Sequence, residues 1–183
     1  MNEDLFTGKL VRLAAHDPEK EAAMVAAWYK DTSYSRLLSV EPVLPPRSTT
    51  AREMLERPPK PTSFHFGIHT LTDDKLIGFV SLFRVSFMHS DGFVGIGIGD
   101  VESRGKGYGT DAMRVLLRFA FQELNLHRVS LDAIATNARA IRSYEKSGFV
   151  LEGQMRGTEF RGGVRDYVVA MGVLKREWEA KHP

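Results

Sequence analysis

The stretch from Arg104 to Gly109, with the sequence Arg-Gly-Lys-Gly-Tyr-Gly, constrains the fold of this chain more than any other feature. It follows an apolar run at residues 93–98 and precedes a helical pattern that begins near Thr110. Glycine reaches backbone conformations that side chains obstruct, so alternate glycines let neighbouring N–H groups turn toward one anion. The first turn of the next helix adds free N–H groups and the positive end of its dipole. The stretch therefore predicts a strand, an anion-binding loop and a helix, in that order.

The loop residues are candidates for binding a phosphate or pyrophosphate. They are Arg104, Gly105, Lys106, Gly107, Tyr108, Gly109 and Thr110. A tight turn is the simpler alternative, but one glycine would satisfy a turn. Two nucleotide-binding motifs fit poorly, because a P-loop lysine is followed by Ser or Thr whereas Gly107 follows Lys106. The glycine spacing of the dinucleotide-binding fingerprint is also missing.

Composition excludes several classes of protein. The 183 residues suit one domain, 1–183, and the formal net charge of +2 is too small to indicate nucleic acid as the main partner. The chain has no cysteine, which excludes disulfides, cysteine-based metal sites and a cysteine nucleophile, and fits a reducing compartment. No signal peptide or apolar run of ~20 residues is visible, so we expect a cytoplasmic protein without a membrane segment.

The hydrophobic patterns predict an α/β fold, with a mixed sheet and helices on both of its faces. Strands are expected at residues 9–13, 64–70, 76–85, 93–99, 129–135, 150–155 and 164–173. The second to fourth of these should form an antiparallel meander. Helices are expected after Asp17-Pro18, from the capping box Thr50-x-x-Glu53, near Thr110 and at residues 138–147. Residues 31–46 show no regular pattern.

The strand before the loop contains Gly95, Gly97 and Gly99 at alternate positions. Glycine weakens a strand interior and often marks a bulge or a close approach to the backbone. We favour a ligand that lies along this strand, because the strand runs directly into the anion loop. A crowded contact between a helix and the sheet is the alternative.

Asp132 is unusual because its strand should be buried, and buried carboxylates are rare unless they are paired or functional. It either pairs with an arginine such as Arg128 or Arg139, or acts as a general base. Further along, Asn137 is suited to cap the following helix, and Tyr144 lies two turns later on the same face. Tyr144 either packs or directs its hydroxyl toward the group that Asn137 contacts.

Together these residues resemble a known enzyme family. Arg-x-x-Gly-x-Gly at 104–109, followed by Asn137-x-x-Ala140-x-x-x-Tyr144 and Gly148-Phe149, is similar to the GNAT superfamily of acetyl-CoA-dependent N-acetyltransferases. Residues 152–153 and 174–178 resemble its Rim-type (ribosomal-protein N-terminal) and spermidine acetyltransferase branch. The resemblance covers about residues 10–178. It implies the GNAT fold, whose central sheet is mostly antiparallel.

The resemblance also implies roles for the residues above. The loop at 105–110 would hold the CoA pyrophosphate, and the pantetheine arm would pair with the backbone of Gly97, Ile98 and Gly99. Asn137 would hydrogen-bond to the pantetheine, and Tyr144 would protonate the departing thiolate. The amine of the acceptor would attack the thioester directly, with no metal. The resemblance is also compatible with a homodimer.

The general base is where the chain departs from the family. Many Rim-type and spermidine members have a Glu where this chain has Val94, whereas some relatives that act on α-amines have a Glu at the position of Asp132. An α-amine, with a pKa near 7.7–8.0, is partly neutral at cellular pH, but a lysine-like amine is almost fully charged. The missing Glu and the retained acid therefore favour either an α-amine acceptor or a base that acts through a bridging water. The acceptor itself is a protein N-terminal α-amine, a polyamine or another small amine.

The acceptor site is expected from loops, namely residues 31–46, the turn at 87–92 and the hairpin at 155–163. Candidate side chains there are Glu41, His89, Arg156 and Glu159, each more typical of a solvated surface position. His16 and His65 are expected to be structural or on the surface. A non-catalytic acyl-CoA-binding module is the main alternative function, although Tyr144 argues against it, and a nucleotide-binding protein is a more distant one.

Overall fold

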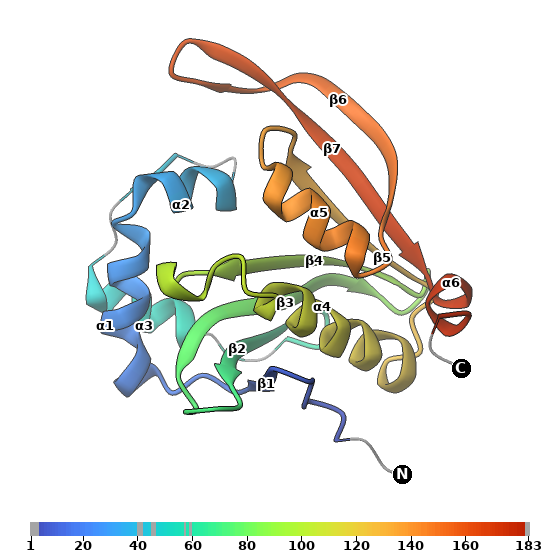
Figure 1. Ribbon diagram of the computed structural model, residues 1–183, viewed down its shortest axis with the longest axis horizontal. Coiled ribbons are helices and arrows are strands. Elements are labelled where there is room, and N and C mark those ends of the chain that lie inside the picture. Colours follow the sequence, from blue (N-terminus) through green and yellow to red (C-terminus); the bar gives the residue numbers. More distant parts are fainter. Residues whose placement is uncertain (1–3, 40–41, 45–46, 57, 59, 182–183) are drawn as a thin grey trace.

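The computed structural model describes residues 4–39, 42–44, 47–56, 58 and 60–181 of the chain. Its centre is a seven-stranded sheet in the order β1-β2-β3-β4-β5-β7-β6 (Figure 1). The strands are β1 Val11–Ala14, β2 Phe64–Thr70, β3 Leu76–Ser86, β4 Asp91–Ile98, β5 Arg128–Ile134, β6 Val150–Arg161 and β7 Val164–Leu174. Neighbouring strands are antiparallel except for β4 and β5, which are parallel. The mixed sheet, the meander and the mostly antiparallel pairing are confirmed.

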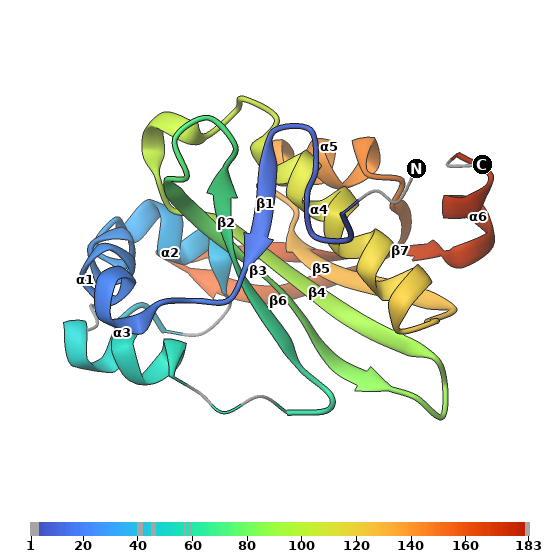
Figure 2. The ribbon, with the colours of Figure 1, turned by 90° about the horizontal axis from the view of Figure 1, so that it is seen from below.

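Helices lie against both faces of this sheet. They are α1 Pro18–Tyr29, α2 Thr32–Leu38, α3 Ser48–Leu55, α4 Tyr108–Arg118, α5 Ala138–Lys146 and α6 Lys175–Glu179. In Figure 2, α1, α2 and α3 cluster on one side of the strands, whereas α4 runs along the other. Strand β4 shows the same division, since Ile96 and Ile98 contact α4 near Gly109, while Gly97 faces Tyr34 of α2. None of the described helices is both long and apolar enough to cross a membrane.

Two predictions about the helices are wrong. Residues 32–38, predicted to be irregular, form α2, because Asp31 caps the helix by accepting hydrogen bonds from the backbone N–H groups of Ser33 and Tyr34. The capping box at Thr50 does not form. Helix α3 begins two residues earlier, at Ser48, and its N-cap Arg47 makes no side-chain capping bond. Helix α1 begins as predicted, with Asp17 as its cap and Pro18 at its first position.

Helix α4 is fastened to the edge strand β1 by a buried carboxylate. Asp111, in the first turn of α4, is 6% exposed. It accepts hydrogen bonds from the backbone N–H groups of Lys9, Leu10 and Val11, at 3.2, 2.7 and 3.1 Å. Because these bonds join residues a hundred positions apart, they fix where the first turn of α4 lies relative to the sheet.

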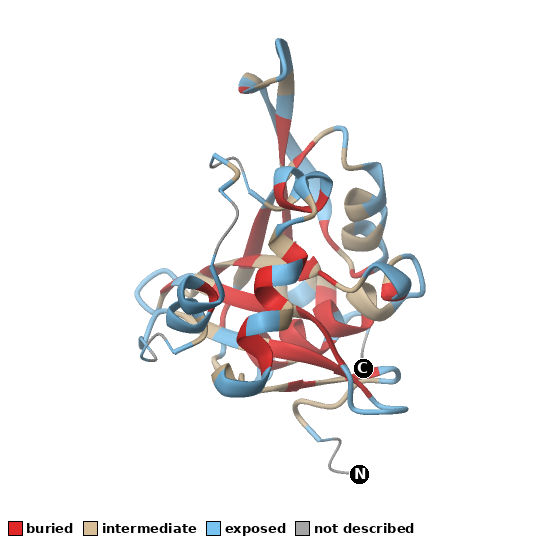
Figure 3. Cartoon of the chain, turned by 90° about the vertical axis from the view of Figure 1, so that its left-hand side faces the viewer, coloured by how far each residue is buried: buried red, intermediate tan, exposed pale blue. Residues whose placement is uncertain are grey.

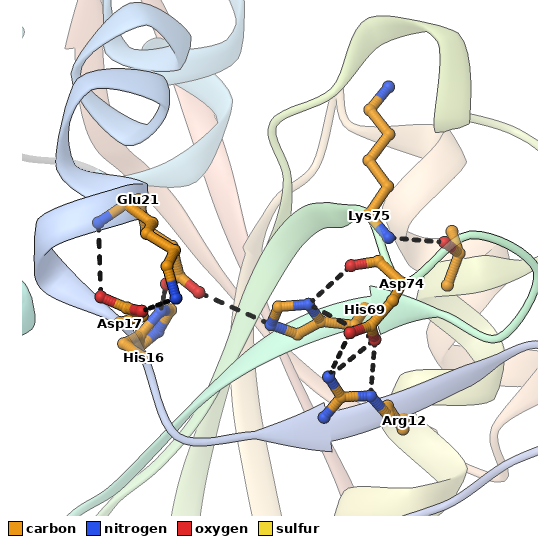
Figure 4. A network of polar contacts seen from close by, with 9 residues as sticks. Arg12, His16, Asp17, Glu21, His69, Asp74 and Lys75 are labelled. Atoms are coloured by element: carbon orange, nitrogen blue, oxygen red, sulfur yellow. Dashed lines mark hydrogen bonds and ion pairs between the residues drawn. The ribbon is translucent and has the colours of Figure 1, made fainter.

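A second polar network joins α1 to strands β1 and β2 (Figure 4). Its centre is the buried carboxylate of Glu21, which lies 2.6 Å from Nδ1 of His16 and 3.6 Å from Nε2 of His69. Arg12 of β1 pairs with Asp74 in the turn that follows β2. His16 is therefore structural, as expected, and His65, which bonds to Ser81 at 2.8 Å, has a similar role.

The sheet divides in its middle. Strands β4 and β5 pair only through Asp91–Arg128, Gly92–Val129 and Phe93–Ser130, although both strands continue beyond these residues. Strand β5 instead remains paired with β7 along its whole length. The β6–β7 hairpin extends beyond the rest of the chain and is exposed over most of its outer part (Figures 1 and 3). The division creates an opening between β4 and β5.

Candidate active site

A cleft of about 1010 Å³ lies at the division between β4 and β5. Its walls come from β4, β5, α2, α5 and the glycine loop. Ten of the predicted site residues line it: Gly97, Ile98, Arg104, Gly105, Gly107, Gly109, Thr110, Asp132, Asn137 and Tyr144. Gly99, Lys106 and Tyr108 are not part of the wall. Gly99 is buried under Trp28, Lys106 is exposed, and Tyr108 packs against the core.

The glycine loop leads directly into the N-terminus of helix α4. Gly105 and Gly107 have φ angles of +77° and +90°, in the left-handed region that favours glycine. Gly107 is the N-cap of α4, and among the described residues no side chain makes a capping hydrogen bond to the start of this 11-residue helix. Thr110 Oγ1 lies 2.8 Å from Oγ of Ser143 and links this turn to α5. The open turn can therefore hold an anion at the end of the cleft.

Arg104 is oriented toward the protein rather than toward that anion site. Its Nε and Nη2 donate hydrogen bonds to the carbonyl oxygens of Ile98 and Gly99, at 3.0 and 2.9 Å. Its Nη1 bonds to Asp31 at 3.1 Å. Three bonds from one guanidinium thus hold the end of β4 and the start of α2 together.

Packing against helices explains Gly97 of β4 and Gly99, which follows the last residue of that strand. A Cβ on Gly97 would clash with the Tyr34 hydroxyl, and a Cβ on Gly99 would clash with the ring of Trp28. A Cβ on Gly95 would reach only ordinary contact, at 3.4 Å from Phe83. The crowded helix–sheet contact, which we did not favour, accounts for two of the three glycines. The backbone of residues 95–98 nevertheless lines the cleft, because its polar groups lie in the plane of the sheet.

Helix α5 places Asn137 and Tyr144 on the same wall. Asn137 caps α5, with its Oδ1 accepting a hydrogen bond from the N–H of Ala140 at 3.3 Å, and its amide nitrogen is not used in this cap. Tyr144 packs edge-on against Phe149, with ring centroids 6.2 Å apart. Burial raises the pKa of Tyr144 to about 12, so its phenol remains protonated at neutral pH.

Asp132 differs from its predicted environment. We expected it to be buried, but it is exposed at the mouth of the cleft, because β4 has separated from β5 at this level. The alternative of a pair with an arginine such as Arg128 is not realised, since Arg128 binds Glu152 through both terminal nitrogens. Among the described residues, Asp132 makes no ion pair. Of the described residues that line the cleft, Asp132 is the one carboxylate.

The loops expected around the acceptor are only partly brought together. Arg161 of the hairpin donates hydrogen bonds to the carbonyl oxygens of Arg36 and Ser39, at 3.0 and 2.6 Å, beside a second cavity of about 350 Å³. Glu159 is 5% exposed and paired with Arg161, which corrects its predicted surface position. The turn at 87–92 does not reach the cleft, and His89 and Arg156 are exposed. Glu41 lies outside the described residues.

The residues that sequence reasoning missed lie mainly on α2. Ser33, Tyr34, Leu37 and Leu38 all line the cleft. The available signal was Asp31 before Thr32-Ser33, which is typical of a helix cap. Helix α5 adds three basic residues to the wall of the cleft: Arg139, Arg142 and Lys146.

Three comparisons with known proteins agree with this geometry. The Acetyltransferase (GNAT) domain family matches residues 11–150. The probable N-acetyltransferase YjcK of Bacillus subtilis is 37% identical over 128 residues, which are 69% of this chain and 70% of YjcK. The putative ribosomal N-acetyltransferase YdaF of the same organism is 35% identical over 61% of this chain and 60% of its own length.

A solved structure shows the same fold. The spermidine N-acetyltransferase from Vibrio cholerae, in complex with CoA and spermine, superposes with a TM-score of 0.80. The match covers 92% of this chain and 98% of that one, at 22% identity. This chain therefore belongs to the GNAT acetyltransferase family and is an N-acetyltransferase that uses acetyl-CoA.

Proposed function

We propose that acetyl-CoA lies in the cleft with its pyrophosphate at loop 105–110, its pantetheine arm along Gly97–Ile98 of β4 and its thioester near Asp132 and Tyr144. One observation carries this placement. The uncapped N-terminus of α4 opens on the same cleft as Asp132 and Tyr144. An anion site at one end and two proton-handling groups on the walls suit a phosphorylated thioester.

Tyr144 then acts as the general acid. Its phenol, with a pKa of about 12, keeps its proton at neutral pH, whereas thiols of the cysteine type have a pKa near 8.5. The phenol can therefore donate to the sulfur as the carbon–sulfur bond breaks and stabilise the leaving group. Asn137, through the amide nitrogen that its cap does not use, holds the pantetheine beside it.

Asp132 acts as the general base. Since it is exposed at the mouth of the cleft, a water molecule can stand between its carboxylate and the incoming amine. Val94, the apolar residue at the position of the family glutamate, is 5% exposed and gives β4 no carboxylate at this point. Most of the rate enhancement comes from holding the amine beside the thioester.

The acceptor that the charges favour is the α-amine of a peptide or protein N-terminus. Asp132 is the one carboxylate among the described residues that line the cleft, whereas four lining residues are basic: Arg104, Arg139, Arg142 and Lys146. Arg36 and Arg161 line the neighbouring cavity. Such surroundings do not complement a polyamine with several positive charges. A single amine followed by an uncharged or acidic chain fits them.

A polyamine is the second candidate, because spermidine N(1)-acetyltransferases are among the relatives, at 32% identity for that of Vibrio cholerae. The test is CoA release by the purified chain with short N-terminal peptides and with spermidine at equal concentrations. We expect kcat/KM to be at least tenfold higher for the preferred peptide. A higher kcat/KM for spermidine would mean that the acceptor is a polyamine rather than a peptide N-terminus. No release with any amine would contradict the placement of the catalytic residues.

The proposal extends to organisation and location. A single domain, 1–183, in the cytoplasm would have both acetyl-CoA and nascent or mature N-termini available. A homodimer is consistent with the exposed apolar residues Val150, Leu151 and Phe160 on the outer strand β6. Light scattering coupled to size exclusion will test the assembly.

A further inference from the structure

Gly95 is the glycine of β4 that packing against a helix does not explain. A Cβ at this position would have Phe83, at 3.4 Å, as its one neighbour within 4 Å apart from the adjoining residues of the strand. Gly97, two residues further along the same face, is instead covered by Tyr34 and Leu38 of α2. Glycine weakens a strand interior and often marks the close approach of another group. The face of β4 at Gly95 therefore borders open space.

Gly95 and Asp132 lie at the same level on the two strands that separate. Phe93 and Ser130 form the last pair between β4 and β5, and Gly95 and Asp132 are each two residues beyond it. Residues two apart on a strand face the same side of a sheet, and so do the two members of a pair. The Asp132 side chain and the space at Gly95 are therefore on one face. Both residues line the cleft, so this space lies across the cleft from the proposed base.

The surfaces around this space are apolar. Phe83 of β3 lines the cleft and packs against Phe93, with ring centroids 6.3 Å apart. Helix α2 adds Leu37 and Leu38 to the lining. Among the described cleft residues, those from β3, β4 and α2 include no charged side chain. A charged group brought to this part of the cleft would lose its water without gaining a partner, whereas an apolar group would gain from burial.

We propose that the space at Gly95, bounded by Phe83 and helix α2, is the subsite for the side chain of the acceptor's first residue, and that this side chain is apolar. The inference rests on the proposed function, because it takes the α-amine to lie beside Asp132. In a peptide, the first side chain branches from the same carbon that carries the α-amine. The side chain therefore enters the space at Gly95 when the amine is at Asp132. The missing side chain at residue 95 provides the room, and the Phe83 ring provides the contact surface.

Peptides that differ only in their first residue test this subsite. The purified full chain is given acetyl-CoA and otherwise identical peptides that begin with Leu, Met, Ser or Asp, and CoA release gives kcat/KM for each. Because one methylene group in an apolar pocket is worth about 10- to 200-fold, Leu and Met should exceed Ser by about tenfold or more. Asp should be the poorest of the four. Equal kcat/KM for Leu and Ser, or a preference for Ser or Asp, would overturn the subsite.

Two substitutions alter the subsite by different means. Gly95→Leu fills the space and Phe83→Ala removes the contact surface, so each should lower the ratio of kcat/KM for Leu over Ser by about tenfold. The control is Phe87→Ala, since Phe87 is 55% exposed in the turn after β3 and is not part of the cleft wall. It should leave the ratio unchanged. A general loss of folding or of acetyl-CoA binding lowers kcat/KM for both peptides alike and does not change their ratio.

The outcomes separate this subsite from the proposed function. Peptides that are acetylated with the wild-type ratio in both Gly95→Leu and Phe83→Ala would overturn the subsite and leave the peptide acceptor standing. If Gly95→Leu does not fold, Phe83→Ala decides alone. Acetylation of spermidine but of no peptide would overturn the peptide acceptor, and the subsite with it.

Discussion

Nη1 of Arg104 lies 3.1 Å from Oδ2 of Asp31, a residue 73 positions earlier in the chain. The pair joins Arg104, at the start of the glycine loop, to the N-terminus of helix α2, and both line the cleft. Asp31 also caps α2 through Ser33 and Tyr34, so one carboxylate serves both the helix and the arginine.

Asp31 gives a prediction about acid stability. Hydrogen bonds from Ser33 and Tyr34, together with the neighbouring Arg104, lower its pKa to about 2, from an ordinary value of 3.8. A lowered folded-state pKa contributes stability that is present above about pH 4 and is lost as the pH falls toward about 2. Asp31→Asn keeps a capping side chain but loses the charge. Its free energy of unfolding should be lower than that of the wild type at pH 7, and the difference should vanish near pH 2. A constant difference in urea titrations across this range would contradict the assignment.

Tyr144→Phe tests the general acid. Removing the phenolic proton should lower kcat by about 10²–10⁴ while acetyl-CoA affinity, measured by calorimetry, changes little. The ring that packs on Phe149 is retained, so the fold should be unaffected. Unchanged kcat under conditions in which chemistry limits the rate would remove Tyr144 from this role.

Asp132→Asn tests the base. Because Asp132 is exposed and has no ion pair among the described residues, the substitution should change the free energy of unfolding by no more than about 0.5 kcal/mol. We expect kcat/KM to fall by about 10²-fold and its rise with pH to be altered. Asp132→Glu should recover part of the activity, since it restores a carboxylate. Full activity in Asp132→Asn would show that the amine needs no base from the protein.

Gly95 in β4 and Gly99, which follows the end of that strand, allow a matched comparison of two Gly→Ala substitutions. Gly99→Ala places a methyl group against Trp28 and should destabilise the protein by about 1–3 kcal/mol, as overpacking does. Gly95→Ala meets Phe83 only at 3.4 Å and should cost well below that. Chemical denaturation of both variants measures the difference. Equal costs would mean that the helix contact does not explain Gly99.

The meander, the glycine loop and α5 could be predicted because each depends on residues close together in sequence. The apolar patterns identify β2 and β3, and the glycines at alternate positions identify the loop. Asn137 caps its own helix. Helix α2 was missed, because its seven residues include Thr, Ser and Tyr, and a distant arginine completes its anchoring. Local patterns do not reveal such a partner.

Two burial predictions were wrong for the same reason. Asp132 looked buried because its strand is apolar, but β4 leaves β5 before that residue is reached. Glu159 looked exposed because it lies in a hairpin, but Arg161 beside it holds the hairpin against the end of α2. In each case the path of a neighbouring strand or hairpin decides the exposure of a side chain, and that path is a property of the whole sheet.

Three residue pairs join β4 to β5 at one end of the cleft: Asp91–Arg128, Gly92–Val129 and Phe93–Ser130. Beyond Phe93 and Ser130 the two strands are no longer paired, although β4 continues to Ile98 and β5 continues to Ile134. The cleft therefore opens beyond the pair Gly92–Val129, and neither of these two residues lines it. Gly92 is tightly packed, because a Cβ added to it would lie only 3.2 Å from Leu82 and 3.3 Å from Val85. A side chain at residue 92 would therefore crowd the last paired residues before the strands separate, at a position that contributes no group to the cleft wall.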